Sequence, residues 1–534
     1  MSDDEKEDVQ PYNQTLDSSA GAAALLEGHM YRVTEGNDKV PTPSFTRPMG
    51  DRTTVLDIAD RDEMDDNLFP LTAKDSFFTR DPSFRVLPFA TSLQEFVYKG
   101  TASFGGTFVF EIGSVNACDI LQSVSFQIRL GHWLSQDVLN NIEKKRWTYA
   151  NPNYAWTYAN SLGTILIQKA QFMLDDQVLE TIDGDFTNVV SLLFPDVNEQ
   201  FGAGRDAYGR WSIPELIDFS ANITRYPSFA NFPTSNGMIT CILPFSFQRM
   251  KLRGGFPLIS CKAGTVRVQI TLRPFSECVR RLNETRDFCN QTPLGLPFVF
   301  NIQGGGTQTV VASTVVPAFQ DARLVTYGIM TDGKLRTALL RAPFDRLYRE
   351  VSAFMFDEPK KYVVNTGVGG TVSLQLPLEI NNPVEEILWI VRRKAVSLNN
   401  EWTNYSSVIE SEYNLQYNPF QSMLINAAIQ VNGENFVEGN ERYFRREIAQ
   451  AHRGGIVPYN QFVYGYSFAK RPGKQDPTGW FNASRATDVR LRLQVTPPVA
   501  LTNSDDLAFE VFVWVIGMNW VRFENGIANR VFSS

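Results

Sequence analysis

The chain has 534 residues, with abundant Phe (39) and Gly (36) and a modest charged fraction of 20%. At this length two or more domains are expected, and many short apolar runs broken by Gly, Pro, Asn and Asp indicate mainly β-structure with long loops. The net charge of −8 argues against direct binding to nucleic acid, because neutralising phosphates requires an excess of Lys and Arg.

The negative charge is concentrated at the N-terminus. Residues 1–70 carry 16 acidic and six basic side chains, so the remainder of the chain is close to neutral. Residues 1–75 show no sustained periodicity apart from a short helical pattern at Ala20–Glu27. We therefore expect an acidic N-terminal arm, either a solvated tail or a segment that orders when neighbouring molecules are present.

Cysteine usage and hydropathy bear on the compartment. The five cysteines form no CxxC pair, which favours a reducing environment and assembly in the cytoplasm rather than the secretory pathway. The first residues, MSDDEKEDVQ, lack the basic and apolar regions of a signal peptide, and the apolar stretch Ala508–Val521 is too short to span a bilayer. A soluble protein is expected. The cysteines are Cys118, Cys241, Cys261, Cys278 and Cys289.

From Phe77 onward the pattern is that of β-strands. Strict alternation of apolar and polar residues puts one face of a strand in a core and the other in a polar environment, as in sandwiches and barrels. Helical patterns are short, at Leu134–Trp147 and Gly439–Ala451. The alternating segments are Val124–Leu130, Val266–Arg273, Val372–Ile380, Val489–Val495 and Phe509–Val515.

Four features occur in the same order in both halves of the chain. They are a strand ending in Glu-Ile followed by an acidic-Ile-Leu string, a strand reaching a tight turn, a Ser-Phe pair, and an alternating strand. The shared order predicts two tandem β-sandwiches: an arm over residues 1–75, a first sandwich over 76–305, a linker over 306–322 and a second sandwich over 323–534. The paired features are Glu111-Ile112 to Asp119–Leu121 and Glu379-Ile380 to Glu386–Leu388, Asp175-Asp176 and Asn432-Gly433, Ser246-Phe247 and Ser467-Phe468, and the strands from Val266 and Val489.

No pattern of catalytic or metal-binding residues is present. The three histidines, His29, His132 and His452, lie far apart in sequence and form no HxH or HExxH motif, which argues against a cupin-type metal site or a catalytic triad. Gly367–Gly370 is not followed by Lys-Ser/Thr, and the acidic pair Asp175-Asp176 has turn chemistry rather than the spacing of an EF-hand. We predict no enzyme, no catalytic, cofactor-binding or metal-binding residues, and no cofactor.

An aromatic pentapeptide occurs twice, at Trp147–Asn151 and Trp156–Asn160. Trp and Tyr are common anchors in interfaces, so this segment could bind sugars or a partner protein, or its rings could pack inside the fold. The sequence leaves both interpretations open.

Several strings along the chain carry a resemblance to a known protein family. The block with the highest specificity is Tyr466–Ala469 followed by Gln475–Gly479 and Phe481–Arg485. It resembles the YSFALKP, QPSG and NFSR strings of the major capsid proteins of nucleocytoplasmic large DNA viruses. Further matches, in the right order over roughly residues 77–534, are Leu243–Arg249, Gly255–Ile259, Val266–Leu272, Asn382–Val391, and more weakly Tyr158–Asp185 and Asn519–Ser534.

The resemblance implies an all-β fold of two tandem eight-stranded antiparallel jelly rolls, with long loops and an N-terminal arm. It further implies a homotrimeric, pseudo-hexagonal capsomer that tiles the icosahedral shell of a large double-stranded DNA virus. The implied partners are copies of the chain itself, minor capsid and penton proteins, and proteins of an internal membrane, without direct contact to nucleic acid. Its expected location is the outer capsid shell of the virion.

Departures from the family pattern concern the lineage. The arm does not match the short family N-terminus, and Asp175-Asp176-Gln177 replaces Gly-Gly-Gln. Two other classes of function remain: a viral spike or carbohydrate- or receptor-binding β-sandwich protein, favoured by the aromatic repeat, and, third, a metal-dependent enzyme.

Overall fold

The computed structural model describes twelve stretches of the chain, and everything below concerns these residues. The expected N-terminal arm lies outside them. The chain divides into two units, Met1–Leu87 and Pro88–Ser534, and only the second is described. The described stretches are 88–98, 102–113, 117–150, 155–193, 238–249, 255–282, 293–357, 370–410, 419–452, 461–473, 476–496 and 508–532.

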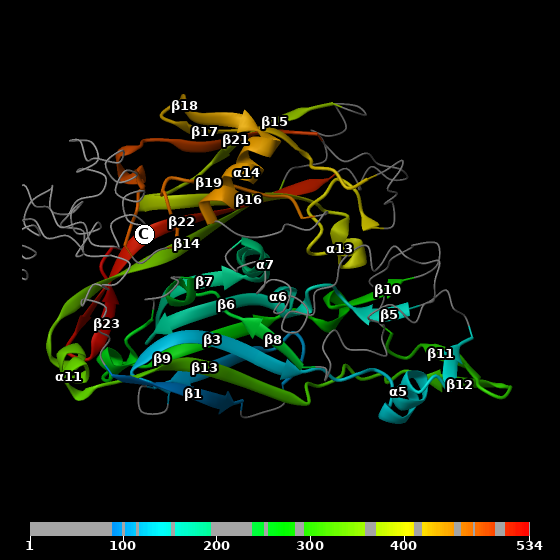
Figure 1. Ribbon diagram of the computed structural model, residues 1–534. Coiled ribbons are helices and arrows are strands. Elements are labelled where there is room, and N and C mark those ends of the chain that lie inside the picture. The colour runs from blue at the N-terminus through cyan, green and yellow to red at the C-terminus, as the bar shows by residue number, and fades with distance from the viewer. Residues whose placement is uncertain are drawn as a thin grey trace, which may run out of the picture. The chain divides into compact units, whose positions relative to one another are not determined.

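Two four-stranded antiparallel sheets form the first sandwich (Figure 1). Sheet 1A has the order β1 (Phe89–Val97), β13 (Asp321–Thr331), β3 (Ile120–Arg129), β8 (Met238–Ile242). Sheet 1B has the order β2 (Thr107–Ile112), β9 (Val266–Leu272), β6 (Ile167–Leu174), β7 (Gln177–Asp183).

The second sandwich has the same construction. Sheet 2A has the order β14 (Phe344–Asp357), β22 (Phe509–Glu524), β16 (Pro383–Arg393), β19 (Val463–Ser467), with β20 (Phe481–Asn482) added to β16 and β23 (Ile527–Arg530) added to β22. Sheet 2B has the order β15 (Val372–Pro377), β21 (Val489–Val495), β17 (Leu424–Val431), β18 (Glu434–Asn440).

The two sandwiches share one connectivity. When the eight strands of each sandwich are counted in chain order, each strand has the same place in its sheet as its counterpart in the other sandwich. Thus β1 corresponds to β14, β3 to β16, β7 to β18 and β13 to β22. Eight antiparallel strands in two sheets with this order form a jelly roll. The predicted fold class, a tandem pair of jelly rolls, is confirmed.

Alternating side chains build the cores as the sequence predicts. In β9 and β21 the apolar positions are buried, whereas the residues between them are partly or fully exposed. The inward residues of sheets 2A and 2B, among them Trp389, Leu491 and Val513, form one apolar cluster. Burying such a side chain contributes roughly 1.5–3 kcal/mol, so these strands hold the sandwiches together.

The turn between the fourth and fifth strands is the same in both sandwiches. Asp175 and Asn432 each have a left-handed backbone, with φ of 53° and 52°. Each side chain accepts hydrogen bonds from a threonine just before the next strand of its sheet: Asp175 Oδ1 from Thr265 N at 2.7 Å, and Asn432 Oδ1 from Thr487 N at 2.8 Å. Asp and Asn tolerate this conformation, and the acidic pair at Asp175 is part of a turn.

Short helices and small sheets connect the strands. The helical patterns predicted at Leu134–Trp147 and Gly439–Ala451 correspond to α5 and α14. Two small sheets are also present. One has the strand order β12-β11-β4, and the other pairs β10 with β5. The elements are α5 (Gln136–Glu143), α6 (Leu162–Ile165), α7 (Gly184–Leu193), α10 (Ser246–Arg249), α11 (Gly333–Arg341), α13 (Val396–Asn399), α14 (Glu441–His452), η5 (Leu258–Cys261), η6 (Phe275–Glu277), η8 (Ala483–Arg485), β4 (Trp147–Tyr149), β5 (Ala155–Tyr158), β10 (Val279–Leu282), β11 (Pro297–Ile302) and β12 (Thr307–Val311).

Strand pairing differs from the expected boundary between the sandwiches. The linker predicted over 306–322 contains β12, and Gly304–Gly306 form the tip of the β11–β12 hairpin, with positive φ at all three glycines. Strand β13, predicted in the second domain from residue 323, pairs with β1 and β3 and so lies in the first sandwich. A jelly roll needs its last strand beside its first, and the sequence alone does not reveal this non-local pairing.

Candidate functional site

Among the described residues no cluster is suited to bind a metal ion. His132 Nδ1 accepts a hydrogen bond from Leu134 N at 2.8 Å, and its ring lies beside Trp133. No group of three His, Cys, Asp or Glu residues in the described stretches could hold a metal ion. His29 and the side chain of His452 lie outside the described part. In the same part, none of the helices is long and apolar enough to cross a membrane.

Four cysteines are free and buried: Cys118, Cys241, Cys261 and Cys278. Burial raises the pKa of the Cys118 and Cys261 thiols to about 12, and the charges of nearby Asp119 and Asp175 add to the effect. Because the thiolate is the reactive form, these residues behave as small apolar side chains. Cys289 lies outside the described residues.

The aromatic repeat occupies two different sheets. Trp147 lies in β4, with its ring centroid 5.6 Å from that of Phe300 in β11. Trp156 lies in β5, opposite Arg281 of β10. The last residues of the second copy, from Tyr158 on, are buried. The Tyr158 hydroxyl donates a hydrogen bond to the carbonyl of Gly131.

The contact between the two sandwiches is the most elaborate site in the described chain. Sheet 2A is buried on both faces: Trp389 and Val513 face the core of the second sandwich, whereas Leu388, Ile390 and Trp514 join the core cluster of the first. Helix α7, which follows β7, lies against this second face with all its residues buried. Figure 1 shows α7 between the two sandwiches.

An arginine anchors α7 to sheet 2A. Arg392 of β16 pairs with Asp185 of α7 at 2.7 Å and with Glu510 of β22 at 2.6 Å, and its guanidinium lies 4.6 Å from the centroid of the Phe512 ring. Next to it, burial and the charge of Asp185 raise the pKa of Asp183 to about 6. The sequence indicates this site only through charged residues at the end of a long apolar strand.

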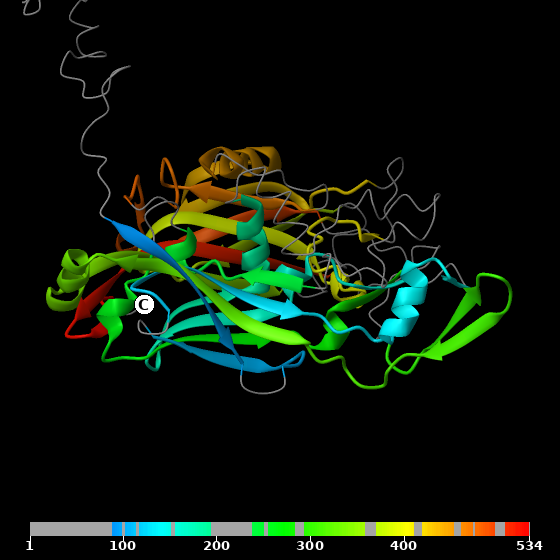
Figure 2. The same ribbon diagram turned by 60° about the horizontal axis from the view of Figure 1, so that its bottom comes forward.

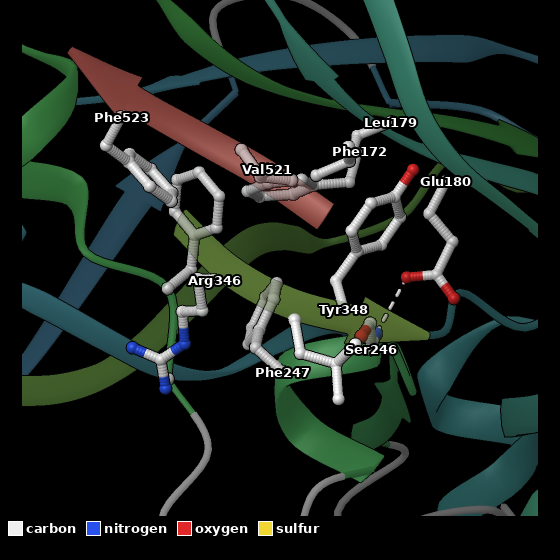
Figure 3. A pocket seen from close by; sticks show the side chains of 12 residues that line it. Phe172, Leu179, Glu180, Ser246, Phe247, Arg346, Tyr348, Val521 and Phe523 are labelled. Carbon is white, nitrogen blue, oxygen red and sulfur yellow. Dashed lines mark hydrogen bonds between the residues drawn. The ribbon is translucent and has the colours of Figure 1, made fainter. Parts of the chain in front are cut away.

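A second buried ion pair lies beside a small cavity. Glu180 of β7 pairs with Arg249 of α10 at 2.7 Å and accepts a hydrogen bond from Ser246 N at 2.7 Å (Figure 3). Burial raises the pKa of Glu180, and the positive charge of Arg249 opposes this shift. Arg249 also donates to the carbonyl of Arg349 in β14 at 2.9 Å, and Arg349 in turn pairs with Glu385 of β16.

The cavity is too small for an organic ligand. Its volume is ≈ 20 Å³, about the space of one water molecule. Both sandwiches line it, Phe172 and Phe256 from the first and Tyr348 and Phe523 from the second. It is therefore a packing defect of the contact and not a binding site.

The loop after β16 makes a third set of contacts with the first sandwich. Asn400 donates to the carbonyls of Ser276 and Val279, both at 2.7 Å. Arg280 of β10 pairs with Glu410 at 2.6 Å and lies 3.7 Å from Glu401. Burial, followed by the charge of Glu410, raises the pKa of Glu401 to about 7.

Sheet 1A differs from its counterpart 2A because the described residues leave its outer face uncovered. Leu93 of β1 lies opposite Tyr327 of β13, and both are exposed, as are Phe89 and Val97 on the same face of β1. Figure 2, in which the lower side of Figure 1 comes forward, shows β1 (blue) in front of the first sandwich. Contiguous exposed apolar residues on a sheet face are a common mark of an interface.

The family-like block around residue 480 has a packing role. Phe468, Phe481 and Tyr466 form a cluster of rings, with centroids 5.1 Å and 5.3 Å apart around Phe468. Gly479 has φ of +151°, and a Cβ there would lie 2.5 Å from the carbonyl oxygen of Phe468. The Tyr-Ser-Phe-Ala, Pro-Thr-Gly and Asn-Ala-Ser-Arg strings are therefore brought together at the edge of β16.

Known proteins share this fold. PBCV-1 VP54, in a crystal structure fitted into a reconstruction of the virophage Sputnik, matches with a TM-score of 0.58 and 17% identity over 86% of this chain and 100% of that one. The Faustovirus major capsid protein matches with a TM-score of 0.57 and 12% identity over 87% and 95% of the two chains. No curated protein sequence matches the chain.

A family model described as "Large eukaryotic DNA virus major capsid protein" matches residues 359–529, within the second sandwich. The strand order and the structural matches define a double jelly-roll fold. The family match, which covers less than half of the chain, shows that the second sandwich is similar to the major capsid proteins of large eukaryotic DNA viruses.

Proposed function

We propose that the chain forms a homotrimer whose six sandwiches make a pseudo-hexagonal capsomer, and that these capsomers tile an icosahedral shell. The observation that carries this proposal is the unequal burial of two equivalent sheets. The outer face of sheet 2A is covered by the first sandwich, whereas no described residue covers the outer face of sheet 1A, with Leu93 and Tyr327.

A contact of the same kind, made between neighbouring chains, would cover the outer face of sheet 1A as well. In this arrangement the second sandwich of one chain covers sheet 1A of its neighbour, as the first sandwich covers sheet 2A within a chain. Each chain then has one surface that docks on a neighbour and one face that receives a neighbour. Such a head-to-tail interface closes into a ring when the rotation permits. Three chains with two similar sandwiches each give six near-equivalent positions around the ring.

Light scattering on the purified protein tests the trimer. An obligate interface of about 2,000 Å² or more between chains should make the trimer stable at low concentration. The expected mass is that of three chains of 60.3 kDa. A stable monomer would contradict the proposal.

We further propose that the acidic N-terminal arm lies below the shell and contacts basic minor capsid proteins. Its excess of acidic side chains, 16 against six basic ones in residues 1–70, would attract basic partners and be repelled by DNA. Deletion of residues 1–70 should leave trimers intact and impair assembly of the shell. Normal particles after the deletion would argue against this role.

Other parts of the assignment follow from the family and are proposed with it. Penton proteins and proteins of an internal membrane are the further expected partners, assembly takes place in the host cytoplasm, and the chain has no enzymatic role. For the division of the chain we propose residues 332–343, around helix α11, as the connection between the sandwiches, because β13 pairs in the first and β14 in the second.

A further inference from the structure

We propose that the exposed side of helix α14, with Arg442 and Tyr443, is the part of one chain that docks on the outer face of sheet 1A in the next chain. The receiving residues are Leu93, Tyr327 and the carboxylate of Glu95. This inference rests on the proposed trimer and assigns its contact surfaces.

Helices α7 and α14 are equivalent elements. Each follows the fifth strand of its sandwich, β7 or β18, and each begins with the same kind of side-chain cap. Asp183 Oδ1 accepts a hydrogen bond from Phe186 N at 2.6 Å, and Asn440 Oδ1 accepts one from Tyr443 N at 3.0 Å. The caps align Phe186 with Tyr443, and therefore Asp185 with Arg442.

Within the chain, α7 supplies the contact. Phe186 is fully buried, with its ring centroid 6.0 Å from that of Trp514, and Asp185 pairs with Arg392. The aromatic ring and the charged residue before it thus dock on the outer face of sheet 2A.

Helix α14 presents the same two positions without a described partner element. Its inner side is fixed to its own sandwich, because Phe444 is buried with its ring centroid 5.1 Å from that of Trp389. The outer side carries Tyr443, which is 39% exposed, and the exposed Arg442 and Arg446.

The receiving face matches this side in shape and charge. Leu93 and Tyr327 are directly opposite each other and give an apolar patch for an aromatic ring. Beside them Arg323 pairs with both Glu95 and Asp321, so that two carboxylates share one cation. An additional cation would balance this cluster. In the contact within the chain, helix α7 supplies the acidic residue and sheet 2A the basic one. In the proposed contact between chains, helix α14 supplies the basic residue and sheet 1A the acidic one.

The segment before β1 is a poorer occupant. Residues 1–70 carry 16 acidic and six basic side chains, and an acidic segment would be repelled by the net negative cluster of Glu95, Asp321 and Arg323. A second copy of the chain, with the basic outer side of α14, has the complementary charge.

Two variants of the full-length chain test the assignment. Variant one combines Arg442→Glu with Tyr443→Asp; variant two is Leu93→Asp. The matched controls are Leu340→Asp on α11, where Leu340 is 38% exposed against 39% for Tyr443, and Val311→Asp on β12, where Val311 and Leu93 are both 62% exposed. Light scattering at one concentration should give trimers for the wild type and both controls, and loss of the trimer for both variants.

Mixing the two variants tests the head-to-tail arrangement. Variant one keeps its receiving face and variant two keeps its helix, so an equimolar mixture should form a species of two chains that cannot close into a ring. If the wild type is trimeric but variant one or variant two also remains trimeric, or the mixture stays monomeric, the assignment of the surfaces is overturned while the trimer stands. A monomeric wild type would overturn the trimer itself.

A cross-link covers the case in which the charged variants do not fold. In the otherwise unchanged chain, Tyr443→Cys with Leu93→Cys and a short bismaleimide should give covalently joined chains on a denaturing gel. Leu340→Cys with Leu93→Cys is the control. Equal cross-linking between chains in the pair and the control would overturn the proposal.

Discussion

The carboxylate of Asp183 joins the two jelly rolls through the indole of Trp514. Its Oδ2 accepts a hydrogen bond from Trp514 Nε1 at 3.2 Å, and the two residues are 331 positions apart in the sequence. Its Oδ1 accepts a hydrogen bond from Phe186 N and so caps the first turn of α7. One side chain therefore fixes the start of the helix and its contact with sheet 2A.

Replacing Trp514 by Phe should lower the free energy of unfolding by about 1–3 kcal/mol, because the buried Asp183 oxygen loses its donor while most of the ring packing remains. Denaturant titration of the purified protein measures the change. Trp480→Phe is the control, since Trp480 is 57% exposed and its loss should change little. Equal effects of the two substitutions would contradict the role of the hydrogen bond.

Replacing Arg249 by Met should destabilise the protein by about 3–5 kcal/mol, because Glu180 would be left as a buried charge without its cation. The double variant Arg249→Met with Glu180→Gln should recover part of the loss. Arg522→Met removes an exposed pair with Asp345 and should have little effect. A double variant no more stable than Arg249→Met would argue against the unpaired charge as the cause.

Stability should depend on pH through Glu401. Its folded-state pKa of about 7 is above the ordinary value of 4.5, so the folded chain binds this proton more tightly than the unfolded chain. The free energy of unfolding should therefore fall as pH rises from about 4.5 to about 7. Glu401→Gln should flatten this part of the thermal-unfolding profile, whereas the exposed Glu111→Gln should not. Unchanged slopes in Glu401→Gln would exclude this carboxyl as the source.

Substitution of Gly479 by Ala should destabilise the second sandwich by about 1–3 kcal/mol. The residue has a positive φ, and the added Cβ would meet the carbonyl oxygen of Phe468. Gly433→Ala is a useful comparison, because Gly433 also has a positive φ, of 87°, but no atom lies within 4 Å of the added Cβ. Thermal unfolding should show the larger loss for Gly479→Ala, and equal losses would mean that the close contact adds nothing.

The sequence predicted the fold class and the internal duplication because both depend on local patterns. Alternation in Val266–Leu272 and Val489–Val495 fixes which face of each strand is buried, and the turns at Asp175 and Asn432 require residues that tolerate positive φ. The end of the first sandwich could not be read in this way. Strand β13 is placed by pairing with β1, more than 220 residues earlier.

The contact between the sandwiches was also not predicted. Asp185, Arg249 and Arg392 are ordinary charged residues in the sequence, and they become significant only when distant segments meet in a buried environment. The Arg392-Arg393 pair at the end of the apolar strand β16 was the one visible signal, since charges seldom follow such a run unless they are paired.

Substitutions on the covered outer face of sheet 2A and on the outer face of sheet 1A, which no described residue covers, should have different consequences in evolution. A polar change at Trp514 harms the folding of each chain, whereas in the proposed trimer one at Tyr327 leaves a well-folded subunit whose defect emerges only when subunits meet. If the proposed contact holds, lineages should diverge at the two surfaces under separate constraints, with Tyr327 and its neighbours changing in concert with α14.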